Sequence, residues 1–198
     1  MTSPTLLIAR LYEHIEPIAR GERYEDPLLG ALESRGLGSV TGGGSQLNEH
    51  GGIEFAEIEI EVANLDDALA VIVDTLERAG APEGSELLRD AEVVRQFGKQ
   101  QGVAVYLDGV SLPDDVYANL DFGATVDSLE SVAGPASYHG FWQGPEETGL
   151  FFFGPNAEDM FSRLEQVLRD LPIGQNARVV VRAGKKGLPS RTVHMPRH

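Results

Sequence analysis

The sequence predicts an α+β protein made of two related β-β-α-β units that pack together, preceded by one or two N-terminal helices. Three observations predict it: strict apolar–acidic alternation, apolar stripes at helical spacing, and one element order that recurs in both halves. Short connections favour an antiparallel or mixed sheet with helices mainly on one face. We expect a single compact domain, residues 1–198, made of residues 1–36, 37–100 and 101–198.

Residues 1–36 are predicted to be helical. Thr2 or Ser3 would cap the first helix and Pro17 would end or kink it, while residues 26–36 form a second, shorter helix. The apolar residues that predict the first helix lie at the spacing of one helix face: Leu7, Leu11, Ile15 and Ile18.

Residues 53–62 follow a polar, glycine-rich turn and alternate strictly between apolar and acidic side chains from Ala56 onward, which predicts a β-hairpin. Because successive side chains of a strand point to opposite faces, the apolar set faces the core and the acidic set faces solvent. The acidic residues are Glu57, Glu59 and Glu61, with Glu54 near the start of the strand.

The second half of the chain repeats this plan. Aligned without a gap, Asn64 matches Asn156 and Asp67 matches Asp159, so two helix caps coincide together with the apolar stripes that follow them. This register favours a strand at residues 86–89, although the local spacing also allows a helix. Residues 103–107 form a short strand that links the units, and the absence of a Pro/Ser-rich linker allows one continuous sheet.

Charge is distributed unevenly along the chain. All 31 acidic side chains and 10 of the 16 basic ones lie in residues 1–170, whereas residues 171–198 hold the other six basic side chains. Between Lys99 and Arg163 there is no Lys or Arg beside ten carboxylates. Such a surface repels nucleic acid phosphates and attracts a basic protein.

Several classes of protein are excluded or disfavoured. The chain has no cysteine, which excludes disulfides and thiolate chemistry. No apolar run is long enough to cross a membrane, and the first residues lack the features of a signal peptide, so we expect a cytoplasmic protein.

No set of reactive residues stands out. The run from Gly42 to Ser45 lacks the lysine of a phosphate loop and lies between strands, so a close backbone approach is the better interpretation. Paired carboxylates such as Glu57 and Glu59 suit acid–base catalysis or a divalent cation, but a solvated strand face explains them as well. The five histidines show no metal-ligand spacing. We expect no cofactor, no metal and no catalytic residue.

The segment from Tyr138 to Gly144 contains the only tryptophan of the chain. Regular alternation places Phe141 and His139 on one face, with Phe141 in the core. It places Tyr138 and Trp142 together on the other face, where aromatic residues often anchor a protein interface.

Residues 36–45, 57–59, 65–69, 80–85, 143–148 and 175–180 resemble a family of uncharacterised bacterial proteins, with the patterns Gly-Leu-Gly-x-Val-x-Gly-Gly-Gly-Ser and Gly-Ala-Pro-x-Gly-Ser. The resemblance covers most of the chain from Tyr24 to Arg182. Small acidic α+β proteins of this kind are similar to the immunity proteins of bacterial polymorphic toxin systems. This resemblance implies binding to a toxin and transfers no catalytic residue.

We therefore expect a non-enzymatic, acidic protein-binding module, an immunity-type inhibitor of a cationic toxin domain. One alternative is an enzyme or small-ligand-binding protein with a site between the two units that uses Gly42–Ser45 and His139. Another is a homo-oligomer whose sheet edges pair between copies. The expected partner-binding residues are Glu54, Glu57, Glu59, Glu61, Tyr138, Trp142, Glu146 and Glu147.

Overall fold

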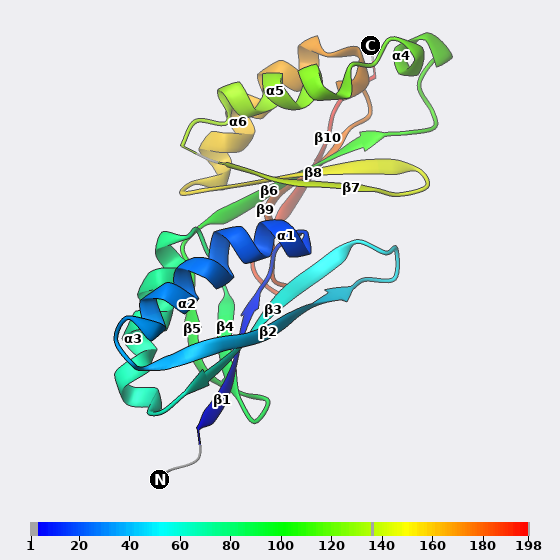
Figure 1. The fold of residues 1–198 in the computed structure, drawn as a ribbon. Helices are drawn as coiled ribbons and strands as arrows, with labels where there is room; N and C mark the ends of the chain where they lie inside the picture. The colour runs from blue at the N-terminus through cyan, green and yellow to red at the C-terminus, as the bar shows by residue number, and fades with distance from the viewer. Residues whose placement is uncertain (1–3, 136, 198) are drawn as a thin grey trace. The chain divides into compact units, whose positions relative to one another are not determined.

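The computed structural model describes residues 4–135 and 137–197 of the chain. The chain divides into two units: the first comprises the residues up to Gln100 except His50–Gly52, and the second comprises His50–Gly52 and the residues from Gln101 onward. Each unit has its own five-stranded antiparallel sheet, so the protein is α+β as predicted, but the strands do not form one continuous sheet (Figure 1).

In the first unit the strands lie in the order β2-β3-β1-β4-β5. A single π-helical turn, Gly21–Glu25, joins α1 to α2. A strand, a helix, a hairpin, a second helix and a fourth strand in this arrangement make the ferredoxin-like β-α-β-β-α-β motif, extended by β5. The elements are β1 (Thr5–Leu11), α1 (Pro17–Arg20), α2 (Asp26–Glu33), β2 (Gly38–Leu47), β3 (Ile53–Val62), α3 (Leu65–Arg78), β4 (Ser85–Arg89) and β5 (Glu92–Phe97).

The helix predicted for the N-terminal segment is wrong, because β1 occupies the centre of this sheet between β3 and β4. Leu7 and Leu11 are four residues apart, a spacing that fits one face of a strand as well as one face of a helix. Ala9, between them, is also fully buried, which identifies the period of two. Pro17 begins α1 instead of ending a helix, and the proposed caps Thr2 and Ser3 lie outside the described residues.

The second unit has the same topology, with its strands in the order β10-β9-β6-β8-β7. Its central strand β6 contains residues 103–107, which were expected only to link the units. Each unit therefore begins with its own central strand. The elements are β6 (Gln101–Asp108), α4 (Asp114–Ala118), α5 (Phe122–Val132), β7 (Ser137–Gln143), β8 (Glu147–Gly154), α6 (Ala157–Asp170), β9 (Arg178–Ala183) and β10 (Arg191–His194).

Matching caps start the two long helices, as the sequence predicts. The side chain of Asn64 accepts a hydrogen bond from the backbone N–H of Asp66 at 3.0 Å, and Asn156 accepts from Glu158 and Asp159 at 3.0 and 3.1 Å. The predicted short second helix is α2, and the predicted strand at residues 86–89 is β4.

Each unit has one hydrophobic core between its sheet and its helices, which cover one face of the sheet (Figure 1). Ile58 and Ile60 of β3 are fully buried in the first core, and Leu150 and Phe152 of β8 are fully buried in the second. Within residues 4–135 and 137–197, no helix is long and apolar enough to span a membrane.

Candidate interaction surface

The acidic residues of β3 lie on the sheet face opposite the helices, as the alternation predicts. Glu59 and Glu61 are exposed. Glu57 is bound by Arg10 of the neighbouring strand, whose Nε and Nη2 lie 2.9 and 2.7 Å from the carboxylate oxygen Oε1. The same guanidinium lies over the ring of Phe55, 4.4 Å from its centroid. A basic side chain therefore lies among these carboxylates.

Glu54 is half-buried and lies where the β2–β3 register shifts, between the paired residues Ile53 and Phe55. It is therefore not part of the regular alternation that forms the row of Glu57, Glu59 and Glu61.

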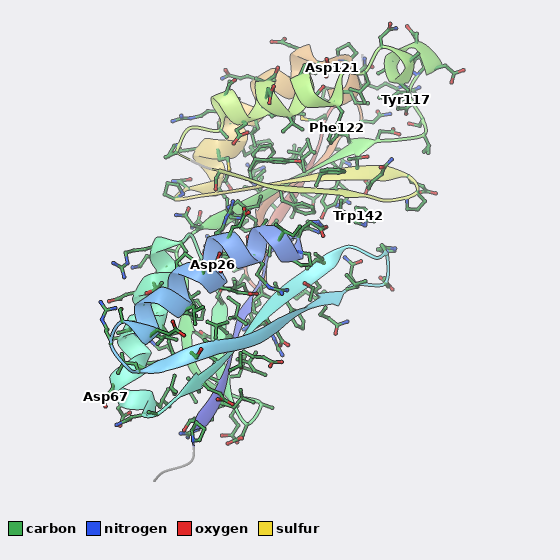
Figure 2. All side chains as sticks on the ribbon, viewed as in Figure 1. Asp26, Asp67, Tyr117, Asp121, Phe122 and Trp142 are labelled. Atoms are coloured by element: carbon green, nitrogen blue, oxygen red, sulfur yellow. The ribbon has the colours of Figure 1, made fainter. Side chains whose placement is uncertain are left out.

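Tyr138 and Trp142 do not lie together, and this prediction is wrong. A β-bulge between Tyr138 and Gly140 shifts the register of β7 by one residue. Tyr138 then pairs with Phe152, whose side chain is buried on the helix-covered face, whereas Trp142 pairs with Gly149. Figure 2 shows Trp142 on the face opposite the helices. Gly140, at the bulge, has a φ of +113°, a conformation that favours glycine.

Tyr138 packs on Phe152 with ring centroids 5.4 Å apart. Burial and the negative charge of Glu130 raise the pKa of Tyr138 to about 12. Its hydroxyl group is buried and has no hydrogen-bond partner among the described residues. Phe141, expected in the core, is 46% exposed and makes an edge contact with Phe122 at 5.2 Å, because β7 is an edge strand.

The two glutamates of the β7–β8 turn differ in their contacts. Glu146 is exposed. Glu147 forms a two-point ion pair with Arg178 of β9, at 3.1 and 2.6 Å, and the Arg178 guanidinium lies 3.9 Å from the ring centroid of Tyr106. Glu147 therefore links β8 to β9 across the central strand β6.

The glycine run on β2 is explained by a close approach of side chains. Arg20 donates from Nη1 to the carbonyl of Gly44 at 2.8 Å and from Nε to Glu25 at 2.5 Å. A Cβ atom at Gly43 would lie 2.9 Å from the Glu25 carboxylate and 3.0 Å from the Arg20 guanidinium. The glycine run therefore leaves room for the Arg20–Glu25 ion pair, in agreement with the close approach to the backbone that the sequence predicts.

The histidines do not assemble a metal site in the part of the chain that the structure describes, where no group of three or more His, Asp or Glu residues has suitable geometry. His139 is buried at the β7 bulge. Its Nε2 lies 2.8 Å from the hydroxyl of Ser137, and its ring packs on Phe153 at 4.7 Å.

A second acidic region lies on the helical layer of the second unit. We call it the acidic helical surface, and Figure 2 shows Asp121 at the start of α5. Each of its carboxylates is exposed, and none makes an ion pair within residues 4–135 and 137–197. The surface consists of Asp114 and Asp115 on α4, Asp121 at the cap of α5, and Asp127 and Glu130 on α5.

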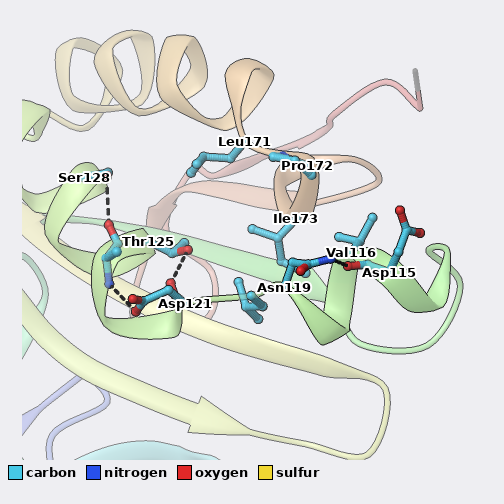
Figure 3. Close-up of a pocket in the computed structure, with 11 residues that line it drawn as sticks. Asp115, Val116, Asn119, Asp121, Thr125, Ser128, Leu171, Pro172 and Ile173 are labelled. Atoms are coloured by element: carbon cyan, nitrogen blue, oxygen red, sulfur yellow. Dashed lines mark hydrogen bonds between the residues drawn. The ribbon is translucent and has the colours of Figure 1, made fainter.

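A groove of about 360 Å³ lies within this surface, between α4, α5 and the 3-10 turn Pro172–Gly174 (Figure 3). The apolar residues that line it are Val116, Leu120, Leu171, Pro172 and Ile173. Asp115 and Asp121 also line it, one from α4 and one from the start of α5, and its described lining includes no Lys, Arg or His.

One carboxylate holds the loop that leads into α4. Asp108, at the end of β6, accepts hydrogen bonds from the backbone N–H groups of Val110 and Ser111 at 2.9 and 2.8 Å. It also accepts from the Ser111 hydroxyl and from the Asn176 side chain, the latter at 3.2 Å. Although burial opposes ionisation, these hydrogen bonds hold the pKa of Asp108 well below its usual range.

Asp108 thereby fixes both sides of the groove. Tyr117 of α4 donates to Asp108 at 3.5 Å and accepts from the Leu112 backbone N–H at 2.9 Å. Asn176 follows the 3-10 turn, which forms the opposite wall.

The sequence signal for this surface is the gap between Lys99 and Arg163, where carboxylates occur without any Lys or Arg. That gap predicts an acidic surface. It does not show that α4, α5 and a turn some fifty residues later in the chain enclose a groove.

Comparison with known proteins adds no assignment. No family model matches the chain, and no curated protein matches it. Solved structures that resemble it include the regulatory subunit of aspartate kinase from Thermus flavus, with 14% identity, a TM-score of 0.28, and coverage of 84% of this chain and 94% of that one. A chlorite dismutase mutant from Candidatus Nitrospira defluvii has 14% identity and a TM-score of 0.28, covering 98% and 92%. TM-scores this low give no basis for transferring an activity.

Proposed function

We propose that this chain is a non-enzymatic protein-binding module that binds a cationic protein through the acidic helical surface. The observation that carries the proposal is that the five carboxylates of this surface are exposed and have no ion-pair partners among the described residues. Complementary charge speeds the encounter of two proteins and selects the partner. The same surface repels phosphates, which favours a protein over a nucleic acid.

Within this class we propose an immunity-type inhibitor of a cationic toxin domain, acting in the cytoplasm. The resemblance of the sequence to small acidic immunity proteins supports this choice, and so does the supply of carboxylates that are not committed to internal pairs. The proposed contact lies on α4 and α5, because Arg10 and Arg178 already bind two of the glutamates first expected to meet the partner.

The test is a calorimetric titration of the purified chain with the protein encoded by the adjacent gene, because inhibitors of toxins are encoded beside their targets. Two double variants each remove two exposed carboxylates. Asp127→Asn with Glu130→Gln changes the acidic helical surface, and Glu59→Gln with Glu61→Gln changes β3. We expect the first to weaken binding about tenfold or more, equivalent to about 1.4 kcal/mol, and the second to weaken it less than about twofold.

Two results would contradict the proposal. The adjacent product fails to bind, which removes the immunity-type assignment, or the two double variants bind equally, which removes the acidic helical surface as the contact. Circular dichroism of both variants checks that the fold is unchanged.

A further inference from the structure

The groove within the acidic helical surface presents an apolar interior. Ile173 is 4% exposed, and Val116, Leu120 and Leu171 are half-buried around it. A volume of about 360 Å³ lies near the lower end of the range for ligand pockets, about 300–1,000 Å³. The groove therefore suits one long side chain better than a large cofactor.

Each donor side chain that lines the groove already donates one hydrogen bond to a nearby backbone carbonyl. Thr125 donates to the carbonyl of Asp121 at 2.8 Å, Ser128 donates to the carbonyl of Ala124 at 2.7 Å, and Asn119 donates to the carbonyl of Asp115 at 2.7 Å (Figure 3). Apart from the second N–H of the Asn119 amide, these side chains and the two carboxylates offer a ligand oxygen acceptors. A complementary group must therefore bring donors.

The charge of the groove also favours a ligand that brings hydrogen-bond donors. Asp115 contributes a carboxylate that takes part in no ion pair with a described residue, and Asp121 uses one oxygen to accept from the Ala124 backbone N–H at 2.9 Å and keeps the other. The described lining includes no basic side chain. An apolar interior with acceptors and negative charge at its edges matches a group that is aliphatic along its length and cationic at its end.

We propose that this groove binds one lysine or arginine side chain of the cationic protein partner and anchors it, an inference that rests on the proposed function. The methylene stem packs on Leu120, Leu171 and Ile173, and the ammonium or guanidinium group meets Asp115 or Asp121. Lys and Arg bury their stems in this way while the charged end stays close to water.

Short peptides test the anchor without knowledge of the partner. The chain, with isotope-labelled methyl groups, is titrated with the peptide acetyl-Gly-Ser-Lys-Ser-Gly-amide and with the same peptide carrying norleucine, which keeps the stem and lacks the ammonium. An arginine peptide forms the third arm. We expect saturable NMR shifts at the methyl groups of Val116, Leu120 and Ile173, with the lysine or arginine peptide binding at least about fivefold more tightly than norleucine.

Two pairs of variants separate shape from charge. Ala124→Leu fills the groove, whereas Ala118→Leu adds the same side chain at an exposed helical position outside it. Asp115→Asn removes a charge from the groove, whereas Asp67→Asn removes an exposed charge from α3 of the first unit, outside both the groove and the acidic helical surface. The first member of each pair should lose peptide binding about fivefold or more, and the second should change it less than about twofold.

Equal binding of the norleucine peptide, or the absence of saturable shifts at the groove methyl groups, would overturn the anchor. If that happens while Asp127→Asn with Glu130→Gln still weakens binding of the partner, the groove assignment fails and the proposed function stands. If that double variant leaves the partner's affinity unchanged, the proposed function fails whatever the peptides show.

Discussion

The two acidic regions of this chain differ in whether basic side chains lie among the carboxylates. On β3, Arg10 binds Glu57 and the other two glutamates of the row are exposed, so one of the three glutamates is part of the bonding within the sheet. On α4 and α5, five exposed carboxylates have no cation partner in the described chain, and two of them, Asp115 and Asp121, line an apolar groove. Acidic composition alone does not distinguish these cases, because the distinction depends on which strands and helices are neighbours.

Carboxylates with internal partners are therefore expected to support stability, whereas the exposed carboxylates of α4 and α5 are expected to support binding. Substitution of Asp108 has the largest expected effect on the free energy of unfolding. Asp108→Ala removes the acceptor for the Val110 and Ser111 backbone N–H groups, and we expect it to lower the free energy of unfolding by about 3 kcal/mol. Urea unfolding measures it. A loss below about 0.5 kcal/mol would show that this network does not hold the loop.

The stabilisation that the Asp108 carboxylate provides is expected to decrease as pH falls. The pKa of Asp108 is lowered in the folded chain, so its stabilisation is present above the unfolded value of about 3.9 and is lost as pH falls below it. The difference in urea midpoint between the wild type and Asp108→Asn should therefore shrink from pH 6 to pH 3. A difference that stays constant over this range would contradict the lowered pKa.

Substitution of Arg10, which binds Glu57 of β3, has the next largest expected effect on the free energy of unfolding. Arg10→Met leaves Glu57 without its cation, and we expect a loss of about 2 kcal/mol in the free energy of unfolding. Glu57→Gln in the Arg10→Met background should recover part of that loss. If the double variant is no more stable than the single one, the ion pair is not the cause.

Substitution of Tyr138 has a smaller expected effect on the free energy of unfolding, and it is stabilising. Its buried hydroxyl has no partner among the described residues, so Tyr138→Phe should raise the free energy of unfolding by about 1 kcal/mol. Because the pKa of Tyr138 is raised to about 12, the wild type should lose stability as pH rises above about 10 and the variant should lose less. Equal losses of the two proteins at alkaline pH would contradict this assignment.

Glu59→Gln with Glu61→Gln has the smallest expected effect, a change in the free energy of unfolding within about 0.5 kcal/mol, because both side chains are exposed. Thermal unfolding checks it. A larger loss would mean that these two glutamates, like Glu57, have a structural role.

Local patterns predicted much of the fold. The alternation of β3 and the caps Asn64 and Asn156 gave correct elements because each depends on a few neighbouring residues. The prediction for Leu7 and Leu11 failed because their spacing fits both a helix and a strand, and only the position of β1 between β3 and β4 decides. The recurring unit was predicted without its first strand and helix, because the N-terminal segment was expected to be helical throughout and residues 103–107 only to link the units.

Less of the candidate site than of the fold could be predicted from the sequence. Alternation fails at a bulge, so the faces of Tyr138 and Trp142 could not be read from their spacing. The gap in basic residues did mark the region that contains α4 and α5. The groove itself requires that Ile173 and Pro172 lie beside Leu120, a contact between segments far apart in the sequence.

The rate of association with the adjacent gene product at low and high salt tests most directly whether α4 and α5 form an electrostatic contact with the partner. With an electrostatic contact on α4 and α5, Asp127→Asn with Glu130→Gln should slow association about threefold or more at low salt, and the difference should vanish at high salt. The β3 pair Glu59→Gln with Glu61→Gln should leave the rate nearly unchanged. Equal slowing by both pairs, or by neither, would contradict a partner surface built on unpaired helical carboxylates.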